Sequence, residues 1–176
     1  SIVKKKIIIC LDADCTVSNN YLEEIIRSFN ENNLSAASIN FKHNIDENSG
    51  TTAAIICYEI FLRYYVLSLK RADSPYSFET IGSAMACDAE SYIKIGGMNK
   101  LKAAEDFYFL EKLSKVTTIN TIKRAIVYPS ARRSWRVPFG TGQRVGRFLD
   151  DVKDEYLLYD PKSFCILKQW LNIFND

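Results

Sequence analysis

The residues of this chain that could carry chemistry gather in two acidic motifs, and the first is Asp12-Ala13-Asp14. It directly follows an apolar, β-branched run, Lys6–Leu11, which predicts a buried strand that stops at Asp12. Two carboxylates spaced i and i+2 after a strand can both face the crevice where open α/β sheets bind ligands. Their hard oxygens suit Mg²⁺ or Mn²⁺, which also hold substrate phosphates. A strand-end turn with two solvated acids is the alternative interpretation, and the chain would then be a non-catalytic α/β fragment or binding module.

The second acidic motif is Glu105-Asp106, at the head of a predicted helix over Phe107–Val116. Acidic residues at a helix N-terminus are favoured by the helix macrodipole, so capping alone can account for the pair. A carboxylate in this position can also take a proton from an acceptor hydroxyl as a general base.

The segment Ile7–Val17 also resembles the first motif of haloacid-dehalogenase-type phosphatases. In those enzymes the first Asp is a nucleophile, the second is a general acid, and a Thr follows two residues later. Thr16 fits that pattern. Cys15 stands where that family usually has Gly, and no later Lys lies in a convincing motif.

Four motifs in order resemble family 2 glycosyltransferases of the GT-A fold, and the likeness covers most of Ile7–Val116. The resemblance implies an α/β, GT-A-like mixed sheet with flanking helices. Residues 1–130 would form its catalytic part, and residues 131–176 an Arg-rich loop and helices that pack on it. The motifs are Leu11-Asp12-Ala13-Asp14-Cys15 with its Val17–Glu24 continuation, Ile81-Gly82-Ser83-Ala84-Met85-Ala86, Ile95-Gly96-Gly97-Met98 and Glu105-Asp106-Phe107-Tyr108-Phe109-Leu110.

The same resemblance implies a metal-dependent, inverting transfer of sugar from a nucleoside-diphosphate donor to the hydroxyl of a glycan or lipid-linked acceptor. By that likeness, Asp14 is the principal metal ligand and Asp12 its neighbour on the nucleotide side. Asp106 is the general base, with Glu105 the less favoured choice. Gly82 and Ser83 would belong to the nucleotide-sugar site.

An Arg-rich stretch departs from the family pattern, because the Gln-x-x-Arg-Trp motif of processive members is absent. This difference argues against a polysaccharide synthase and for an enzyme that adds a single sugar. Arginine side chains can neutralise a diphosphate leaving group, so Arg133, Arg136 and Arg144 are candidates for that role. A solvated basic loop is the alternative.

The elements that must position these residues alternate between strands and helices, which predicts a layered α/β sheet. Further strands are expected at Ala36–Phe41, Thr80–Cys87 and Ile126–Tyr128. Helices are expected after Asn19 or Asn20, over Thr52–Arg71, over Ala89–Ile95, and from Gly142 to about Tyr159.

The composition limits the classes of partner and the cellular compartment that can be expected for this chain. A net charge of +2 offers no strong basic field for nucleic acid. The 5 widely spaced cysteines suit reduced thiols in the cytoplasm.

The apolar segment Ala53–Leu69 contains Glu59 and Arg63 at i,i+4 spacing, where they can pair, which argues against a membrane span. A place at the inner membrane surface, through that helix or Ser163–Phe174, is an alternative to a core helix. His43, the only histidine, is expected to be exposed in a polar loop.

The strand that leads to Asp12 begins within a few residues of Ser1. In the resembling family, further strands and helices precede that motif. The expectation is therefore an N-terminally truncated fragment with an unpaired sheet edge, which would self-associate and transfer little or no sugar alone.

Overall fold

The structure is a computed structural model that describes residues 5–45, 50–100, 104–131, 140–152 and 154–174. It forms two compact units. The first comprises Ser1–Asn44 and Thr80–Ser130, and the second comprises Ile45–Glu79 and Ala131–Asp176.

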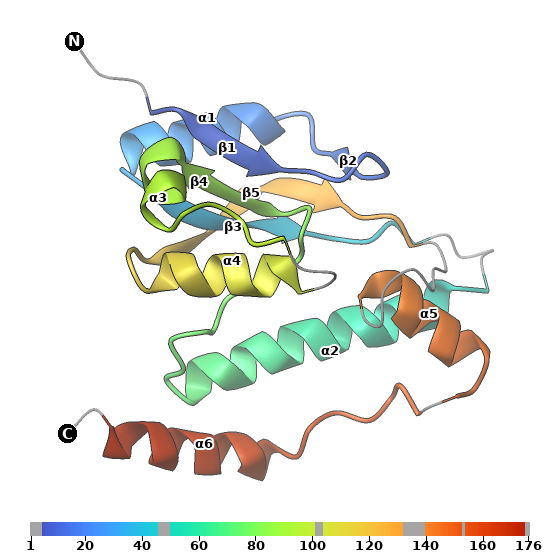
Figure 1. Ribbon diagram of the computed structural model, residues 1–176. Coiled ribbons are helices and arrows are strands. Elements are labelled where there is room, and N and C mark those ends of the chain that lie inside the picture. Colours follow the sequence, from blue (N-terminus) through green and yellow to red (C-terminus); the bar gives the residue numbers. More distant parts are fainter. Residues whose placement is uncertain (1–4, 46–49, 101–103, 132–139, 153, 175–176) are drawn as a thin grey trace. The chain divides into compact units, whose positions relative to one another are not determined.

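The first unit is built on a mixed sheet of 5 strands in the order β1-β4-β3-β5-β2 (Figure 1). The strands are β1 (Ile7–Cys10), β2 (Thr16–Val17), β3 (Ala36–Phe41), β4 (Met85–Asp88) and β5 (Ile119–Tyr128). Only β3 and β5 run parallel, and the other neighbours are antiparallel. This mixed α/β arrangement confirms the predicted fold class.

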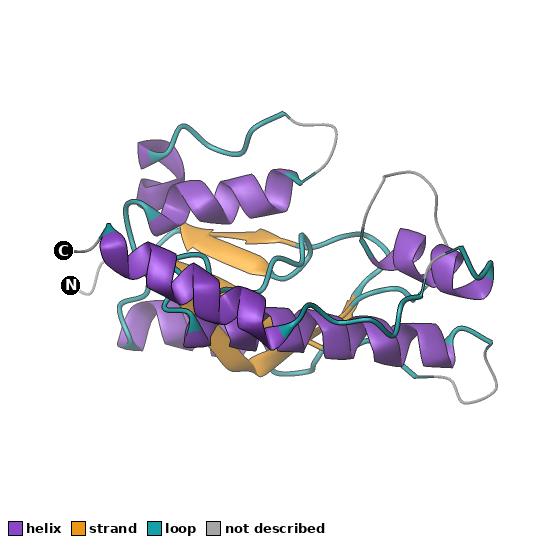
Figure 2. Cartoon of the chain, turned by 90° about the horizontal axis from the view of Figure 1, so that it is seen from below, coloured by secondary structure: helices purple, strands orange, loops and turns teal. Residues whose placement is uncertain are grey.

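Helices cover both faces of that sheet, with α1 (Tyr21–Glu31) on one face and α3 (Ala89–Lys94) and α4 (Glu105–Ser114) on the other (Figures 1 and 2). The apolar side of α1 buries Ile25 and Phe29, while α4 buries Phe109, Leu110 and Leu113. The side chain of Asp88 caps α3 by accepting the Ser91 N–H at 2.7 Å. Apolar packing on both faces of the sheet therefore fixes the position of the strands next to the acidic motifs.

Three local features of the first unit differ from the prediction. Strand β4 begins at Met85 rather than Thr80, because the Ala84 N–H donates to the Ile81 carbonyl at 2.8 Å and closes a turn there. Strand β5 begins at Ile119, well before the expected Ile126. Its exposed polar positions lack the apolar signal on which the prediction relied. The expected exposure of His43 is wrong, since the side chain is 0% exposed, with its ring edge-on to Phe41.

The second unit is helical and consists of α2 (Thr52–Arg71), α5 (Thr141–Leu149) and α6 (Pro161–Ile173). The first half of α2 packs on α5 through Ile55 and Val145. Its last turns pack on α6 through Leu69 and Phe164. Helix α5 ends at Leu149, short of the predicted Tyr159.

Helix α2 groups with the C-terminal helices because it buries apolar residues against α5 and α6. The division into a catalytic part over residues 1–130 and a C-terminal part over 131–176 stays a prediction. Arg63 donates to Glu59 at 3.0 Å, which confirms the predicted pairing along this helix. Among the described residues, α2 is the one helix long and apolar enough to cross a membrane. That test weighs length and composition only, and core helices also pass it.

Candidate active site

The first acidic motif forms a tight turn between β1 and β2. The Cys15 N–H donates to the Asp12 carbonyl at 3.1 Å, which places Ala13 and Asp14 in the middle of a β-turn. Strand β1 is held by β4 on one side of this turn, with Cys10 opposite Met85. On the other side, Thr16 of β2 pairs with Tyr128 of β5. Both arms of the turn are therefore anchored in the sheet.

Because β1 and β2 are the two edge strands, the chain crosses from one sheet edge to the other within Leu11–Cys15. A short connection that contains a tight turn can do this only if the sheet curls at this end. The curl exposes the turn at the sheet's edge, where Asp12 and Asp14 are both exposed and Cys15 is half-buried.

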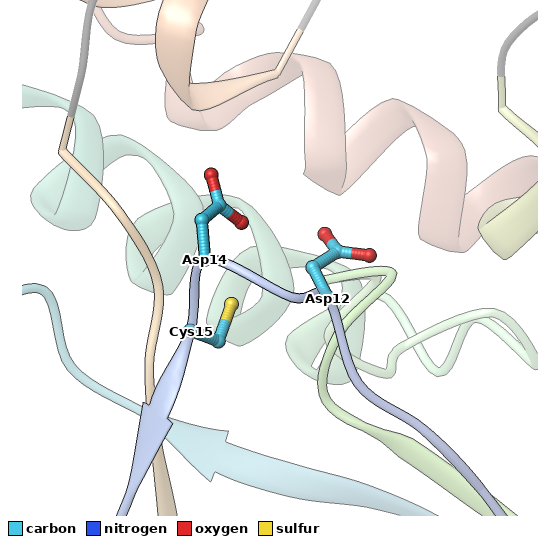
Figure 3. Close-up of side chains that lie close together, drawn as sticks. All are labelled: Asp12, Asp14 and Cys15. Carbon is cyan, nitrogen blue, oxygen red and sulfur yellow. The ribbon is translucent and has the colours of Figure 1, made fainter.

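Three ligand-type side chains converge on this turn. A carboxylate oxygen of Asp12, one of Asp14 and the Cys15 sulfur all lie within 4.8 Å of one another. Figure 3 shows that all three side chains project from the turn in the same general direction. Two hard carboxylates fit the oxygen preference of Mg²⁺ and Mn²⁺, so the donor set suits the predicted metal. Cys15 is not among the predicted ligands, and its place directly after Asp14 is the signal that could have indicated it.

Helix α1 begins with a buried tyrosine. Tyr21 is 3% exposed, and its hydroxyl has no hydrogen-bond partner among the described residues. Burial raises the pKa of Tyr21 to about 12, and the nearby Cys10 and Cys15 thiols add to the rise.

The predicted Gly82-Ser83 element lies at the same end of the sheet. Because Cys10 at the end of β1 pairs with Met85 at the start of β4, the turn before β4 lies beside the turn after β1. Ser83 is buried in that turn. A β-carbon placed on Gly82 would lie 3.5 Å from Asp106 Oδ2. The structure thus brings Asp106 against the Gly82 backbone.

Asp106 is half-buried in the first turn of α4, and its Oδ1 accepts the Phe107 N–H at 2.7 Å. Burial raises the pKa of this carboxyl above its ordinary value, and repulsion from the Glu105 and Asp12 carboxylates adds to the rise. The backbone hydrogen bonds act in the opposite direction and do not offset burial. The two predicted acidic motifs are therefore close enough to interact. Glu105 is exposed.

Of the three arginines predicted to neutralise a diphosphate, Arg144 alone lies among the described residues. Arg133 and Arg136 lie outside them. Arg144, in α5 of the second unit, donates to Glu155, and its guanidinium lies 4.2 Å from the centre of the Phe61 ring. Arg147 Nε also donates to Glu155, at 2.7 Å. The positive charge of Arg144 is thus matched within its own unit, and its role toward a diphosphate stays a prediction.

The acidic turn after the first strand and the half-buried Asp106 thus lie at one end of a curled mixed sheet. The family model described as Glycosyl transferase family 2 matches residues 1–96, more than half of the chain. The chain belongs to glycosyl transferase family 2, and its fold is GT-A-like. A comparison with curated proteins finds no match.

The matched range contains Asp12, Asp14, Gly82 and Ser83, whereas Asp106 lies beyond it. Membership in a glycosyltransferase family sets aside the phosphatase alternative for Asp12. It also gives a nucleotide-sugar donor and a glycan acceptor as the general partners of the family.

Proposed function

We propose that this chain carries the catalytic site of an inverting glycosyltransferase. This enzyme uses a nucleoside-diphosphate sugar and a divalent cation, and Asp106 is its general base. The observation that carries the proposal is the proximity of Asp106 to the Asp12–Asp14 turn, together with its raised pKa. A general base works best when its pKa lies nearer to the working pH than that of an ordinary aspartate.

In this proposal, the Asp106 carboxylate accepts the proton of the acceptor hydroxyl. The hydroxyl oxygen then forms a bond to the anomeric carbon, while the bond from that carbon to the diphosphate oxygen breaks. The half-buried position of Asp106 limits competing hydration of its carboxylate, and the adjacent Gly82 has no side chain to block access. Gly82 and Ser83 would border the donor's sugar at this point.

Asp14 and Asp12 would hold Mg²⁺ or Mn²⁺ through carboxylate oxygens. When bound, such an ion supplies positive charge that stabilises the departing diphosphate. The exposed position of both carboxylates at the sheet's edge supports this assignment, because a diphosphate could approach them without rearrangement of the core. Arg133, Arg136 and Arg144 remain candidates for additional charge neutralisation.

The proposal is tested with the intact enzyme, by release of nucleoside diphosphate from a panel of nucleotide sugars, with and without Mg²⁺ or Mn²⁺. We expect metal-dependent release that Asp14→Ala abolishes, along with metal-dependent binding of the free nucleoside diphosphate in calorimetry. Glu23→Ala is the matched control, since Glu23 is an exposed acid in the adjacent helix α1 and should have no effect. Metal-dependent nucleotide binding that survives Asp14→Ala would contradict the assigned ligand.

A further inference from the structure

We propose that helix α6 attaches this chain to the surface of an anionic lipid bilayer, through an exposed apolar stripe formed by Ile166, Trp170 and Ile173. The inference concerns where the chain is held, and it is independent of the transfer chemistry proposed above.

Helix α6 carries two apolar stripes, and the first packs on α2. Phe164 is buried against Leu69 and Ala72 of α2, and Leu167 packs beside it. This contact holds α6 alongside the last turns of α2 within the second unit (Figure 1). The first stripe therefore accounts for the position of the helix.

The second stripe is exposed. Ile166, Trp170 and Ile173 recur at i, i+4 and i+7, so they share one side of the helix. Their side chains are 65%, 55% and 71% exposed. Phe174 follows at the end of the helix, with its ring centre 4.8 Å from that of Trp170, and is 69% exposed. Exposed apolar patches of this kind mark sites of interaction, and an exposed Trp is typical of the membrane–water interface.

The charges around α6 complement anionic headgroups. Lys162 is exposed one turn before Ile166, on the same side of the helix, and the last turn of α2 adds the exposed Lys70 and Arg71. Lys168 pairs with Asp73 at 2.6 Å. Residues 70–73 and 160–174 together contain four basic and two acidic side chains, a net charge of +2 (4 − 2). Basic side chains beside an apolar helix surface attract anionic lipids.

The same charge distribution favours a bilayer over a second copy of the chain. In a dimer with two-fold symmetry, the same surface patch lies on both sides of the interface. The positive charge around α6 would then lie opposite an equal positive charge. Anionic headgroups instead offer the opposite charge together with an apolar layer for the exposed stripe.

Helix α6 is also already formed. Asp160 caps it by accepting the Lys162 N–H at 2.9 Å, and Pro161 occupies its first turn. The Phe164 ring lies edge-on to the rings of Tyr64 and Tyr65, at 6.0 Å between centres in each pair. The helix therefore does not have to fold on the bilayer, which lowers the entropic cost of binding.

The test is co-sedimentation of the intact protein with vesicles of phosphatidylcholine alone or mixed with phosphatidylglycerol. We expect binding to the mixed vesicles that weakens as salt is added. The double variant Ile166→Ser/Ile173→Ser should bind them at least about tenfold more weakly, because it removes two apolar side chains from the exposed stripe. Ile93→Ser is the matched control, since Ile93 is 75% exposed on α3 of the first unit, and it should bind like the unmodified protein.

Two further measurements separate the apolar and electrostatic contributions. Lys162→Gln should weaken binding to the mixed vesicles by about fivefold and leave binding to phosphatidylcholine unchanged. The chain contains 2 Trp residues, so Trp135→Phe leaves Trp170 as the single one. Its fluorescence should shift to the blue when mixed vesicles are added. Thermal unfolding of each variant, followed by circular dichroism, checks that it is folded.

Failure of the unmodified protein to sediment with the mixed vesicles would overturn the inference, as would unchanged binding by the folded double variant. Equal loss in Ile93→Ser would show that any exposed apolar side chain suffices, which also contradicts it. A dimer in light scattering without lipid that the double variant dissociates would assign the stripe to a second copy instead. Vesicle binding through α6 without turnover of any nucleotide sugar would leave the inference standing and the proposed function refuted, and metal-dependent turnover without vesicle binding would do the reverse.

Discussion

A β-carbon on Gly82 would lie 3.5 Å from Oδ2 of Asp106, so the backbone before β4 forms one wall of the Asp106 site. The two residues come from segments far apart in the chain. They meet because the turn closed by Ile81 and Ala84 lies at the same sheet end as the first turn of α4. This contact connects substitutions at Gly82 to the ionisation of Asp106.

Gly82→Ala should fold normally, because 3.5 Å is ordinary van der Waals contact. The added methyl group excludes water from the carboxylate and should raise the pKa of Asp106 further. The acidic limb of the kcat/KM profile for sugar transfer should therefore move to higher pH. Gly50→Ala is the control, since none of the described residues lies within 4 Å of a β-carbon placed on Gly50. A bulkier Gly82→Val, which pushes the carboxylate aside, should cost up to about 10²-fold in rate.

Asp106→Asn should reduce transfer by about 10²–10⁴-fold while donor binding is nearly retained, because a positioned general base is lost and the amide oxygen can still accept the Phe107 N–H. Glu105→Gln serves as the matched control and should retain activity. If Glu105→Gln shows the large loss instead, the base has been assigned to the wrong carboxylate.

The same Asp106→Asn variant should be more stable than the unmodified protein at neutral pH. A carboxyl whose pKa is raised by folding costs stability once it is ionised, above the folded-state pKa. That cost vanishes below the ordinary value of 3.8, where the group is protonated in both states. Thermal unfolding temperatures should therefore favour Asn at pH 7 and converge in acid. A lower unfolding temperature at pH 7 would show that Asp106 serves mainly to hold α4.

Tyr21→Phe should leave stability unchanged or increase it by about 1–3 kcal/mol, because it removes a buried hydroxyl that has no hydrogen-bond partner in the described part of the chain. Urea unfolding measures this effect. A large loss of stability would mean that the hydroxyl makes a hydrogen bond in solution.

Glu155→Gln should destabilise the second unit by about 3 kcal/mol, because it removes the negative charge that pairs with both Arg144 and Arg147. These two arginines hold the pKa of Glu155 below its ordinary value of 4.5, despite the opposing effect of burial. The stabilisation is therefore present above pH 4.5 and lost as pH falls through the lowered pKa. Urea unfolding across this range should show a smaller acid-induced loss in Glu155→Gln. Parallel curves for the two proteins would contradict the prediction.

Much of the first unit follows from local sequence patterns. The apolar run before Asp12 predicts β1, and β3 forms over the predicted residues Ala36–Phe41. The apolar spacing in α1 and the i,i+4 pair Glu59 and Arg63 in α2 also reflect interactions within one element. Such features depend on the period of a single helix or strand, which the sequence displays directly. The acidic motifs and their order along the chain likewise indicate the family.

Other features depend on which elements meet, and only the tertiary structure decided them. Local patterns do not reveal that α2 packs with α5 and α6, that His43 is buried, or that Arg144 pairs with Glu155. The register of Cys10 with Met85 brings Gly82 beside the acidic turn. The backbone hydrogen bond that closes that turn brings Cys15 close to Asp12 and Asp14. The physical reason is that side-chain type and spacing describe one segment, whereas a site requires strand register and turn closure to bring distant segments together.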